Sequence, residues 1–453
     1  MSRITLRQAA QWCGGFVEEK YADVAFFGAN MDSRKILPGQ LFVALQAERD
    51  GHDFIPMAME KGAAAVLCSR VCGDWPAIVV ADPRRALGDI ARRERERIGM
   101  TVVGVTGSVG KSTTKEMIAC VLAGTFRVEK TPVNQNNDIG LPMAVLSMPE
   151  DTEVAVLEMG MNHFREIAYL SSIARPDVAV VVNVGTMHIE HLGSREGILK
   201  AKMEILEGMR QGGKLILNGD DDMLYSQKEC CGIQPVYFGE KNPESAVCAA
   251  QVSEDENGLH FWVHAGEHSF PIALSLAGSH YVSDALAAVS VALTLGVVPE
   301  KIQQRLSAFR NMEGRQEIFE SKGYTIINDS YNAGPESMKA ALHVLGNREG
   351  RHVAVLGDML ELGVCTQAEH YRVGRIAAEK ADILLAYGAN GCRVISGGLT
   401  GGMPDTKAMA FEDGDKLVST LKHMAKPGDV ILFKGSRGMH MEKLLEKFLQ
   451  DET

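Results

Sequence analysis

A glycine-rich loop near residue 107 carries the residues whose types and spacing are best suited to chemistry. The loop and the start of the next segment read Gly107, Ser108, Val109, Gly110, Lys111, Ser112 and Thr113. Backbone N–H groups of such a loop point at a phosphate chain, its lysine neutralises the outer phosphates, and its serine hydroxyl can hold Mg²⁺. Because Val105 stands where the full pattern has its first glycine, an ordinary glycine turn that opens a helix is the alternative.

Two further groups follow apolar segments that we expect to be strands of the same sheet. Glu158 ends the segment 154–158, and His188 follows the segment 178–183. In an open α/β sheet the carboxyl ends of the strands border the ligand crevice, so both side chains would lie near the glycine loop. Glu158 is then a candidate Mg²⁺ ligand. Taken singly, a solvated strand-end carboxylate and a structural histidine remain alternatives.

Lys202 is predicted to lie on the apolar face of a helix. At 100° per residue, one stripe contains Ile198, Leu199, Ile205, Leu206 and Met209. Lys202 falls inside this stripe, whereas Lys200 points the other way. A buried lysine would need a functional explanation, and the alternative is an apolar stem with its charged head in water.

Composition excludes several classes of protein. The chain has 453 residues, 45% of them hydrophobic, which is typical of a globular protein of about three domains. Its net charge of −11 argues against general binding to nucleic acid or anionic membranes. Nine scattered cysteines contain no C-x-x-C pair, and we expect reduced thiols. With neither a signal-like start nor a long apolar run, we expect a cytoplasmic protein without a transmembrane segment.

The elements that would position these residues form three α/β domains. We expect a small α/β domain over 1–83, a central phosphate-loop domain with a doubly wound, mostly parallel sheet over 84–312, and a Rossmann-like domain over 313–453. The helix 84–98 would link the first two. Strands are predicted at 41–45, 63–67, 78–81, 101–105, 154–157, 178–182, 214–217, 324–327, 352–356, 383–386 and 430–433. Helices are predicted at 282–295 and 299–309, and antiparallel hairpins over 247–274 around a turn at 254–258.

Taken together, the motifs resemble the Mur ligases, the ATP-dependent amide-forming enzymes of peptidoglycan precursor synthesis. The motifs in question are Thr-Gly-Ser-x-Gly-Lys-Ser-Thr at 106–113, Glu-Met-Gly at 158–160, Asn-Val-Gly-x-x-His at 183–188 and Ala-Lys-x-Glu at 201–204. Further matching stretches lie at 32–34, 38–43, 51–54, 131–137, 328–332, 356–363 and 434–437. Several of these are typical of the branch that adds D-alanyl-D-alanine to UDP-N-acetylmuramoyl-tripeptide.

The resemblance implies a role for each site residue. Lys111, His188 and Lys202 would be catalytic, and the lysine matching Lys202 is carbamylated in the family. The Mg²⁺ ligands would be Ser112, Glu158, His188 and Lys202. ATP would be bound by residues 107–113 with His280, Asp284, Arg315 and Asp329. The UDP-sugar-peptide would be bound by Ser33, Arg34, Asn136 and Asn137, and the dipeptide by Tyr331 and Asn332, whose alternative role is a strand-to-helix turn.

The implied reaction is an ATP-dependent ligation through an acyl phosphate, with ATP and Mg²⁺ as cofactors. Its substrates would be UDP-N-acetylmuramoyl-tripeptide and D-alanyl-D-alanine, with diaminopimelate and lysine both open at the third peptide position. We expect a monomer whose third domain closes over the nucleotide. Alternatives are a folylpolyglutamate synthetase-like or tripeptide-forming sister ligase, or a non-catalytic nucleotide-binding regulator. The regulator is suggested by a departure at 280–285, where Asp284 replaces an asparagine and, when ionised, cannot donate to an adenine nitrogen.

Overall fold

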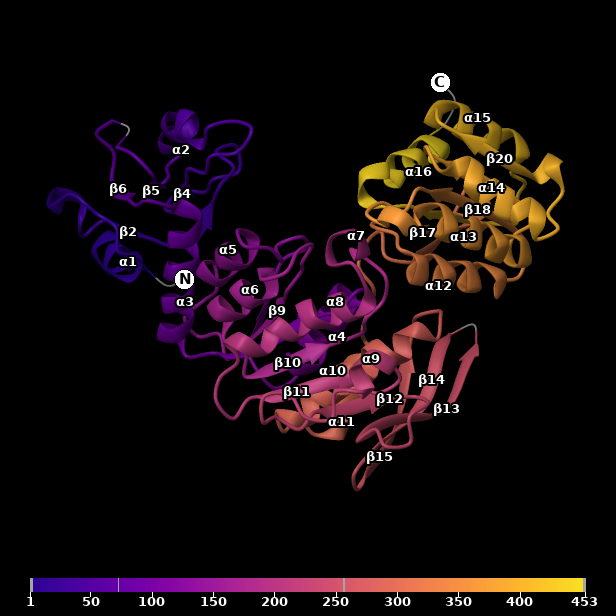
Figure 1. The fold of residues 1–453 in the computed structure, drawn as a ribbon, viewed down its shortest axis with the longest axis horizontal. Helices are drawn as coiled ribbons and strands as arrows, with labels where there is room; N and C mark the ends of the chain where they lie inside the picture. The colour runs from indigo at the N-terminus through magenta and orange to yellow at the C-terminus, as the bar shows by residue number, and fades with distance from the viewer. Residues whose placement is uncertain (1–2, 72, 256, 451–453) are drawn as a thin grey trace.

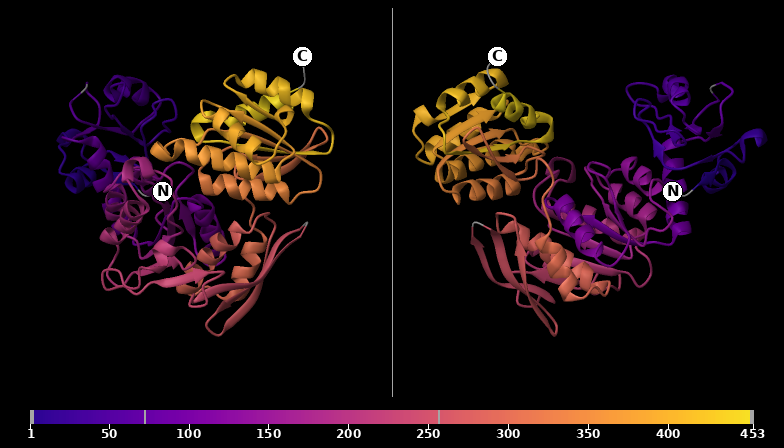
Figure 2. Two further views of the ribbon diagram at one scale, coloured as in Figure 1. Left: turned by 45° about the vertical axis from the view of Figure 1, so that its right-hand side comes forward. Right: turned by 180° about the vertical axis from the view of Figure 1, so that it is seen from behind.

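Three α/β units follow one another along the chain (Figure 1). The structure, a computed structural model, describes residues 3–71, 73–255 and 257–450. The first unit, in indigo, and the third, in orange and yellow, lie on the same side of the central unit, and the view from behind agrees (Figure 2). No helix in these ranges combines the length and apolar character needed to cross a membrane.

The first unit is a small parallel sheet with an added antiparallel pair. Its sheet order is β3-β4-β5-β6, and β1 pairs with β2. The elements are β1 (Ile4–Thr5), α1 (Leu6–Cys13), β2 (Ala25–Phe26), β3 (Ala29–Asn30), β4 (Leu41–Val43), α2 (Ile55–Glu60), β5 (Ala65–Cys68) and β6 (Ala77–Val79). The three strands predicted here are confirmed, with bounds that differ by at most two residues, because short runs of buried apolar residues do not fix strand ends.

A single helix, α3 (Pro83–Ile98), joins the first unit to the central one. Asp82 starts it by accepting hydrogen bonds from the backbone of the first turn, and Gly99 ends it in the left-handed conformation. Leu87 and Ile90 are fully buried, in a core that continues from Leu67 of the first unit into the central one. The predicted linker is therefore a packed helix that shares one core with both units.

The central unit is built on a nine-stranded sheet of order β15-β14-β13-β12-β11-β10-β7-β9-β8. Its sheet elements before the hairpins are β7 (Thr101–Thr106), β8 (Val128–Lys130), β9 (Val154–Glu158), β10 (Val178–Val181), β11 (Lys214–Asn218) and β12 (Val236–Gly239). Its helices are α4 (Lys111–Leu122), α5 (Gly140–Leu146), α6 (Glu166–Ala174), α7 (Ile189–Leu192), α8 (Arg195–Met203), α9 (Asp222–Tyr225), α10 (His280–Thr294) and α11 (Pro299–Ser307). Strands β7, β9 and β10 are parallel neighbours, so their carboxyl ends meet at one edge.

The predicted hairpins complete this sheet. Strands β13 (Val247–Asp255), β14 (Gly258–Ala265) and β15 (His268–Leu274) are antiparallel to one another, and β13 is parallel to β12. The prediction of antiparallel hairpins is confirmed. Leu259, Phe261 and Val263 occupy every second position along β14 and are buried, as expected for a strand with one face against the core. The predicted turn at 254–258 includes Glu256, which lies outside the described residues.

The third unit is a six-stranded sheet of order β16-β17-β21-β18-β19-β20 with helices on both faces. Its elements are β16 (Glu317–Ser321), β17 (Tyr324–Asp329), α12 (Pro335–Gly346), β18 (Arg351–Gly357), α13 (Thr366–Lys380), β19 (Ile383–Tyr387), α14 (Gly391–Thr400), β20 (Ala408–Phe411), α15 (Gly414–Met424), β21 (Asp429–Lys434) and α16 (Met441–Leu449). Only the edge strand β16 is antiparallel to its neighbour. The four predicted strands are confirmed.

Two expectations need comment. The helix carrying Lys202 ends at Met203 and continues as a 3-10 helix over Glu204–Gly208, so the 100° stripe does not extend to Leu206 and Met209. Leu206 and Met209 nevertheless pack, partly buried, against the same apolar core as Ile198 and Ile205. The cysteines within the described residues are free thiols, as expected, and Cys72 lies outside them.

Arg95 tests the packing of α3 against the central unit. Its side chain is 3% exposed, and its guanidinium donates to the carbonyls of Ala174 and Arg175 and to Asp177 at 2.8–3.0 Å. Arg95→Ala should lower the free energy of unfolding by about 2–3 kcal/mol, because it leaves buried acceptors without a donor. Urea unfolding followed by circular dichroism measures this loss. The matched control is Arg93→Ala on the exposed side of the helix, and an equal loss in both variants would contradict the assignment.

Candidate active site

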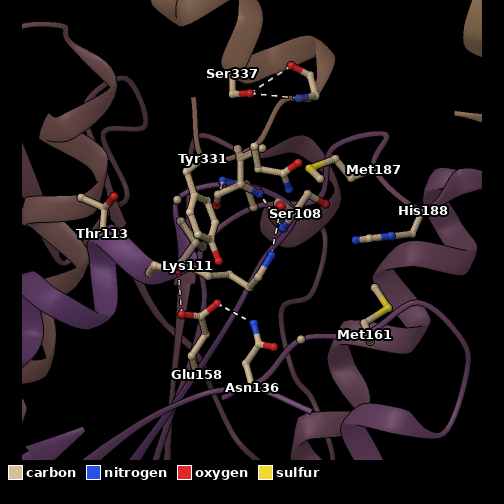
Figure 3. Close-up of a pocket in the computed structure, with 18 of the residues that line it drawn as sticks. Ser108, Lys111, Thr113, Asn136, Glu158, Met161, Met187, His188, Tyr331 and Ser337 are labelled. Atoms are coloured by element: carbon tan, nitrogen blue, oxygen red, sulfur yellow. Dashed lines mark hydrogen bonds between the residues drawn. The ribbon is translucent and has the colours of Figure 1, made fainter. Parts of the chain in front are cut away.

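A cavity of about 930 Å³ lies where the carboxyl ends of the central parallel strands face the third unit (Figure 3). Sixteen of the residues predicted for the site line it. They are Ser108, Val109, Gly110, Lys111, Ser112, Thr113, Asn136, Asn137, Glu158, His188, His280, Asp284, Arg315, Asp329, Tyr331 and Asn332. Residues separated by as much as 224 positions in the sequence, Ser108 and Asn332, therefore share one cavity (332 − 108 = 224).

The glycine loop has the shape that phosphate binding requires. It connects the central strand β7 to the N-terminus of α4, and Gly110 adopts a φ of +80°, which favours glycine. The Asn183 side chain accepts from the N–H groups of Ser108 and Val109 at 3.0 and 2.9 Å. The Lys111 ammonium donates to the carbonyls of Gly107 and Ser108 at 2.8 and 3.1 Å. The lysine thus lies along the inner face of the loop, where an outer phosphate would meet it.

Glu158 connects the glycine loop to the loop at 131–137. It accepts from the Ser112 hydroxyl at 2.7 Å and from the Asn136 amide at 2.9 Å, as Figure 3 shows. Burial acts to raise the pKa of this carboxyl, but Lys111, Lys115 and these hydrogen bonds outweigh it and lower the pKa. Glu158 is therefore a buried, ionised carboxylate.

Ser112 and Glu158 fit Mg²⁺ because they place a hydroxyl and a carboxylate oxygen side by side, and hard oxygens are what this ion prefers. Within the described ranges, no cluster of three or more His, Cys, Asp or Glu side chains could hold a metal by itself. Phosphate and water oxygens would have to complete the coordination, as is usual for Mg²⁺. In the close-up, His188 lies across the cavity from Glu158 (Figure 3).

The third unit contributes a second wall. Arg315 donates to the Ser112 hydroxyl at 2.9 Å, and its guanidinium lies 4.0 Å from the centre of the Tyr331 ring. The Tyr331 hydroxyl donates to Asn134 of the central unit. Asp329 pairs with Lys434 at 2.6 Å, and Lys434 also donates to the carbonyl of Asn332. Tyr331 therefore extends over the glycine loop from the opposite wall (Figure 3).

His188 also contacts the third unit. Its backbone is in the left-handed region, at a φ of +64°, and its Nδ1 atom lies 2.7 Å from Oε2 of Glu361. This contact lowers the pKa of Glu361. His188, a predicted Mg²⁺ ligand, thus contacts the carboxylate of Glu361, to which the sequence analysis gave no role.

Lys202 does not line the cavity but lies buried behind it, with 1% of its surface exposed. Its ammonium has no hydrogen-bond or ion-pair partner among the described residues. Burial, followed by the nearby charge of Lys111, lowers its pKa well below the usual value, against a weaker opposing effect of Asp221. The alternative of a charged head in water is therefore wrong, because the neighbouring elements enclose the whole side chain.

Asp284 lies beneath the glycine loop. It accepts from the Thr114 hydroxyl at 2.7 Å, and a Cβ atom added at Gly110 would lie 2.7 Å from its Oδ1 atom. Burial raises its pKa to about 7, although Thr114 and Arg315 act in the opposite direction. In this position it supports the loop backbone and the first turn of α4.

Four predicted residues lie elsewhere or have other local roles. Gly107, Ser33 and Arg34 do not line the cavity. In the first unit, Arg34 pairs with Asp32 at 2.9 Å, and Ser33 is buried. Asn137 lines the cavity, but its side-chain oxygen caps the start of α5 by accepting from Ile139 and Gly140.

Five residues that contact the site had no role assigned from the sequence: Lys115, Asn183, Glu336, Lys434 and Arg437. Asn183, Lys434 and Arg437 belong to the matching motifs at 183–188 and 434–437. Lys115 is fully buried and donates to the carbonyl of Thr131 at 2.8 Å. Its place one helical turn after Lys111 was the signal that could have revealed it. The contact of Glu336 with Thr186 spans 150 residues and left no local signal.

Comparison with known proteins places this site in a family. Three family models match the chain, described as "Mur ligase family, catalytic domain" over 27–95, "Mur ligase middle domain" over 105–292 and "Mur ligase, glutamate ligase domain" over 314–437. The chain belongs to the Mur ligase family. The resemblance noted from the motifs is therefore confirmed.

Individual relatives of this Mur ligase match over the full length. It is 40% identical to the UDP-N-acetylmuramoyl-tripeptide–D-alanyl-D-alanine ligase of Bacillus subtilis, over 99% of both chains. Its fold matches MurF from Acinetobacter baumannii with a TM-score of 0.91 and 32% identity over 100% of both chains. It matches MurF of Thermotoga maritima in complex with ADP with a TM-score of 0.83 and 30% identity, over 93% and 97% of the two chains. The three-domain α/β prediction is thereby confirmed.

The raised pKa of Asp284 makes a testable prediction about stability. Between the unfolded-state pKa near 4 and the folded-state pKa of about 7, the folded protein binds more protons than the unfolded one, so this carboxyl lowers stability as the pH rises. Asp284→Asn cannot titrate. Its melting temperature relative to the wild type should therefore increase between about pH 5 and about pH 8.

Differential scanning calorimetry of both proteins across this range measures the effect. Asp405→Asn, at an exposed carboxyl of the third unit, is the matched control and should show a constant difference. A constant difference for Asp284→Asn as well would contradict the raised pKa.

Proposed function

We propose that this Mur ligase joins D-alanyl-D-alanine to UDP-N-acetylmuramoyl-tripeptide with hydrolysis of ATP to ADP and phosphate. The observation that carries the proposal is the single cavity in which Lys111 and Glu158 of the central unit face Tyr331 and Asn332 of the third. The identity of 40% over nearly the whole length to a ligase named for this reaction supports it. A folylpolyglutamate synthase of Mycobacterium tuberculosis shares the fold at only 15% identity, which supports no transfer of that activity.

The first step brings two anions together. The carboxylate of the tripeptide attacks the γ-phosphate of ATP, giving an acyl phosphate and ADP. Because carboxylate and triphosphate repel each other, the site must supply positive charge where the phosphoryl group transfers. Lys111, along the glycine loop, and Arg315, against Ser112, both line the cavity and are placed to do so.

Mg²⁺ would supply further charge at the phosphate oxygens when bound. Ser112 and Glu158 would hold it directly. His188 is a proposed ligand on the other side of the cavity. A carbamylated Lys202, whose longer side chain would extend from outside the cavity lining, is the further proposed ligand. Its buried, unpaired amine suits this modification because only the neutral amine reacts with CO₂. The carbamate is an anion, which would also compensate the charge of Lys111.

In the second step the amine of D-alanyl-D-alanine displaces phosphate from the acyl phosphate. The third unit, which we place at 313–453, would hold the dipeptide near Tyr331 and Asn332 and exclude water that would hydrolyse the intermediate. The first unit, at 1–83, would hold the uridine diphosphate near Ser33 and Arg34. The tripeptide would then reach the cavity along Asn136 and Asn137, which line its wall on that side.

Amine selectivity tests this proposal directly. Phosphate release is measured with ATP, Mg²⁺ and the UDP-muramoyl-tripeptide carrying either diaminopimelate or lysine at position three. D-alanyl-D-alanine should support a rate far above that of D-alanine, diaminopimelate, lysine or glutamate, because the chain is 40% identical to a ligase named for this dipeptide. A faster rate with a single amino acid would assign the chain to a sister ligase, and no release with any amine would favour a nucleotide-binding regulator.

Lys202 provides a second prediction. Lys202→Ala should lose at least about 10²- to 10³-fold in rate, the typical cost of one preorganised charge contact, and regain part of it when acetate is supplied to fill the gap. Lys200→Ala, an exposed neighbour on the same helix, is the control and should remain active without acetate. Carbon-13 NMR with labelled bicarbonate should show a carbamate in the wild type that Lys202→Ala lacks. Normal activity of Lys202→Ala, or a wild type without this signal, would refute the carbamate.

A further inference from the structure

Six carboxylates line the cavity, and five of them have defined partners within the described residues. Asp138 pairs with Arg84 at 2.8 Å, Glu166 with His163 at 3.2 Å and Asp329 with Lys434 at 2.6 Å. Glu158 has the partners described above, and Asp284 is buried beneath the loop against Thr114. Glu336 is the sixth, and the described residues provide it with no cationic partner.

Glu336 is nevertheless held in place. Its Oε1 atom accepts from both the backbone N–H and the hydroxyl of Thr186 at 3.1 Å, so two neutral donors fix the side chain. Its Oε2 atom is buried and has no hydrogen-bond partner. Burying a carboxylate oxygen that has no hydrogen-bond donor costs free energy. We therefore expect a donor from outside the described residues to pair with Oε2.

The surroundings of Glu336 indicate what that donor is. The carboxylate lies against Gly185, whose N–H donates to the Ser108 hydroxyl of the glycine loop, so it adjoins the expected phosphate position. A carboxylate beside phosphates is repulsive unless a cation comes between them. Glu336 also begins α12, a few residues after Tyr331 and Asn332, on the wall where the dipeptide is proposed to bind.

We infer that Glu336 binds the ammonium group of the incoming dipeptide and accepts its proton. The inference rests on the proposed function, in which the acceptor arrives as a cation, because an α-amino group with a pKa near about 8 is mostly protonated at neutral pH. Such a group has three N–H donors, of which the unpaired Oε2 atom can take one. No other carboxylate of the cavity is both unpaired by a cation and adjacent to this wall.

The ammonium group loses two protons in this step. The ammonium gives one proton to the Glu336 carboxylate, and the freed nitrogen lone pair attacks the carbonyl carbon of the acyl phosphate. The bond between this carbon and the phosphate oxygen breaks, and phosphate leaves with the electron pair and the second amine proton. The products are the amide, hydrogen phosphate and protonated Glu336, which then loses its proton to solvent.

Glu336→Gln separates the charge from the contact that it makes. Glutamine keeps an oxygen that can accept from Thr186 but removes the negative charge. With ATP and the UDP-muramoyl-tripeptide saturating, this variant should raise the KM for D-alanyl-D-alanine by about 10- to 100-fold, the loss expected for a hydrogen bond to a charged group. Hydroxylamine, which is largely uncharged at neutral pH, should trap the acyl phosphate as a hydroxamate at the wild-type rate.

Three controls complete the experiment. Thr186→Val removes one donor to Glu336 but keeps the charge, so it should leave the ratio of D-alanyl-D-alanine to hydroxylamine turnover close to that of the wild type. Glu349→Gln removes an exposed carboxylate beyond the far end of α12 and should change neither rate. Glu336→Asp keeps the charge on a shorter stem and should retain more dipeptide turnover than Glu336→Gln.

Each outcome bears on the inference. An unchanged KM for the dipeptide in Glu336→Gln, an equal loss with both nucleophiles, or a changed Mg²⁺ requirement in place of a changed KM would overturn it. A wild-type enzyme that makes no product with D-alanyl-D-alanine would instead refute the proposed function, and the assignment of Glu336 with it. If Glu336→Gln does not fold, the inference is decided by whether Glu336→Asp loses dipeptide turnover relative to hydroxylamine.

Discussion

The buried carboxylate of Glu158 is the interaction on which the rest of the site depends. It binds the first turn of α4 through Ser112 and the loop at 131–137 through Asn136. Lys115 lies 3.8 Å away and fixes the same loop through the carbonyl of Thr131. Without Glu158, Lys111 would lose the nearby anion that makes its burial tolerable, because a buried charge is stable only when it is paired. Lys115 would keep its second partner, Glu116, at 3.2 Å. One carboxylate therefore sets the position of the phosphate loop relative to the proposed peptide-binding loop.

Several positively charged side chains line the cavity, although the chain as a whole is negatively charged. The protein has a net charge of −11, yet Lys111, Arg315, Lys434 and Arg437 all line the cavity. A local group of positive charges thus lies in the cavity of a chain whose net charge is negative. Three of the six carboxylates that line the cavity, Asp138, Glu158 and Asp329, each pair with a lysine or arginine. Glu336 differs from these three because neutral donors hold one of its oxygens, while the other is buried without a hydrogen-bond partner.

The units are joined in two physically different ways. The first and central units share one apolar core through α3, which includes Leu87 and Ile90. The third unit meets the catalytic loops through polar contacts, among them Arg315 with Ser112 and Glu336 with Thr186. Small polar interfaces separate at lower cost than a continuous apolar core, so the third unit is the one suited to open and close. Ser112, Arg315 and Glu336 also line the cavity that is proposed to hold the dipeptide, so closure would be coupled to the second step.

The sequence by itself determined the glycine loop, most of the strands, the antiparallel extension and the family, because each depends on residues close together in the chain. Apolar runs predict strands locally, and a loop between strand and helix exposes its own N–H groups whatever surrounds it. Only the tertiary structure decided which way Lys202 points and where Asp284 lies, since the burial of both is imposed by distant elements. Thr114 and Asp284 are 170 residues apart, and Thr186 and Glu336 are 150 apart. Contacts of this kind form only when the folded sheet brings distant loops together. For the same reason, no local sequence pattern shows that Glu336 is the carboxylate left without a cationic partner.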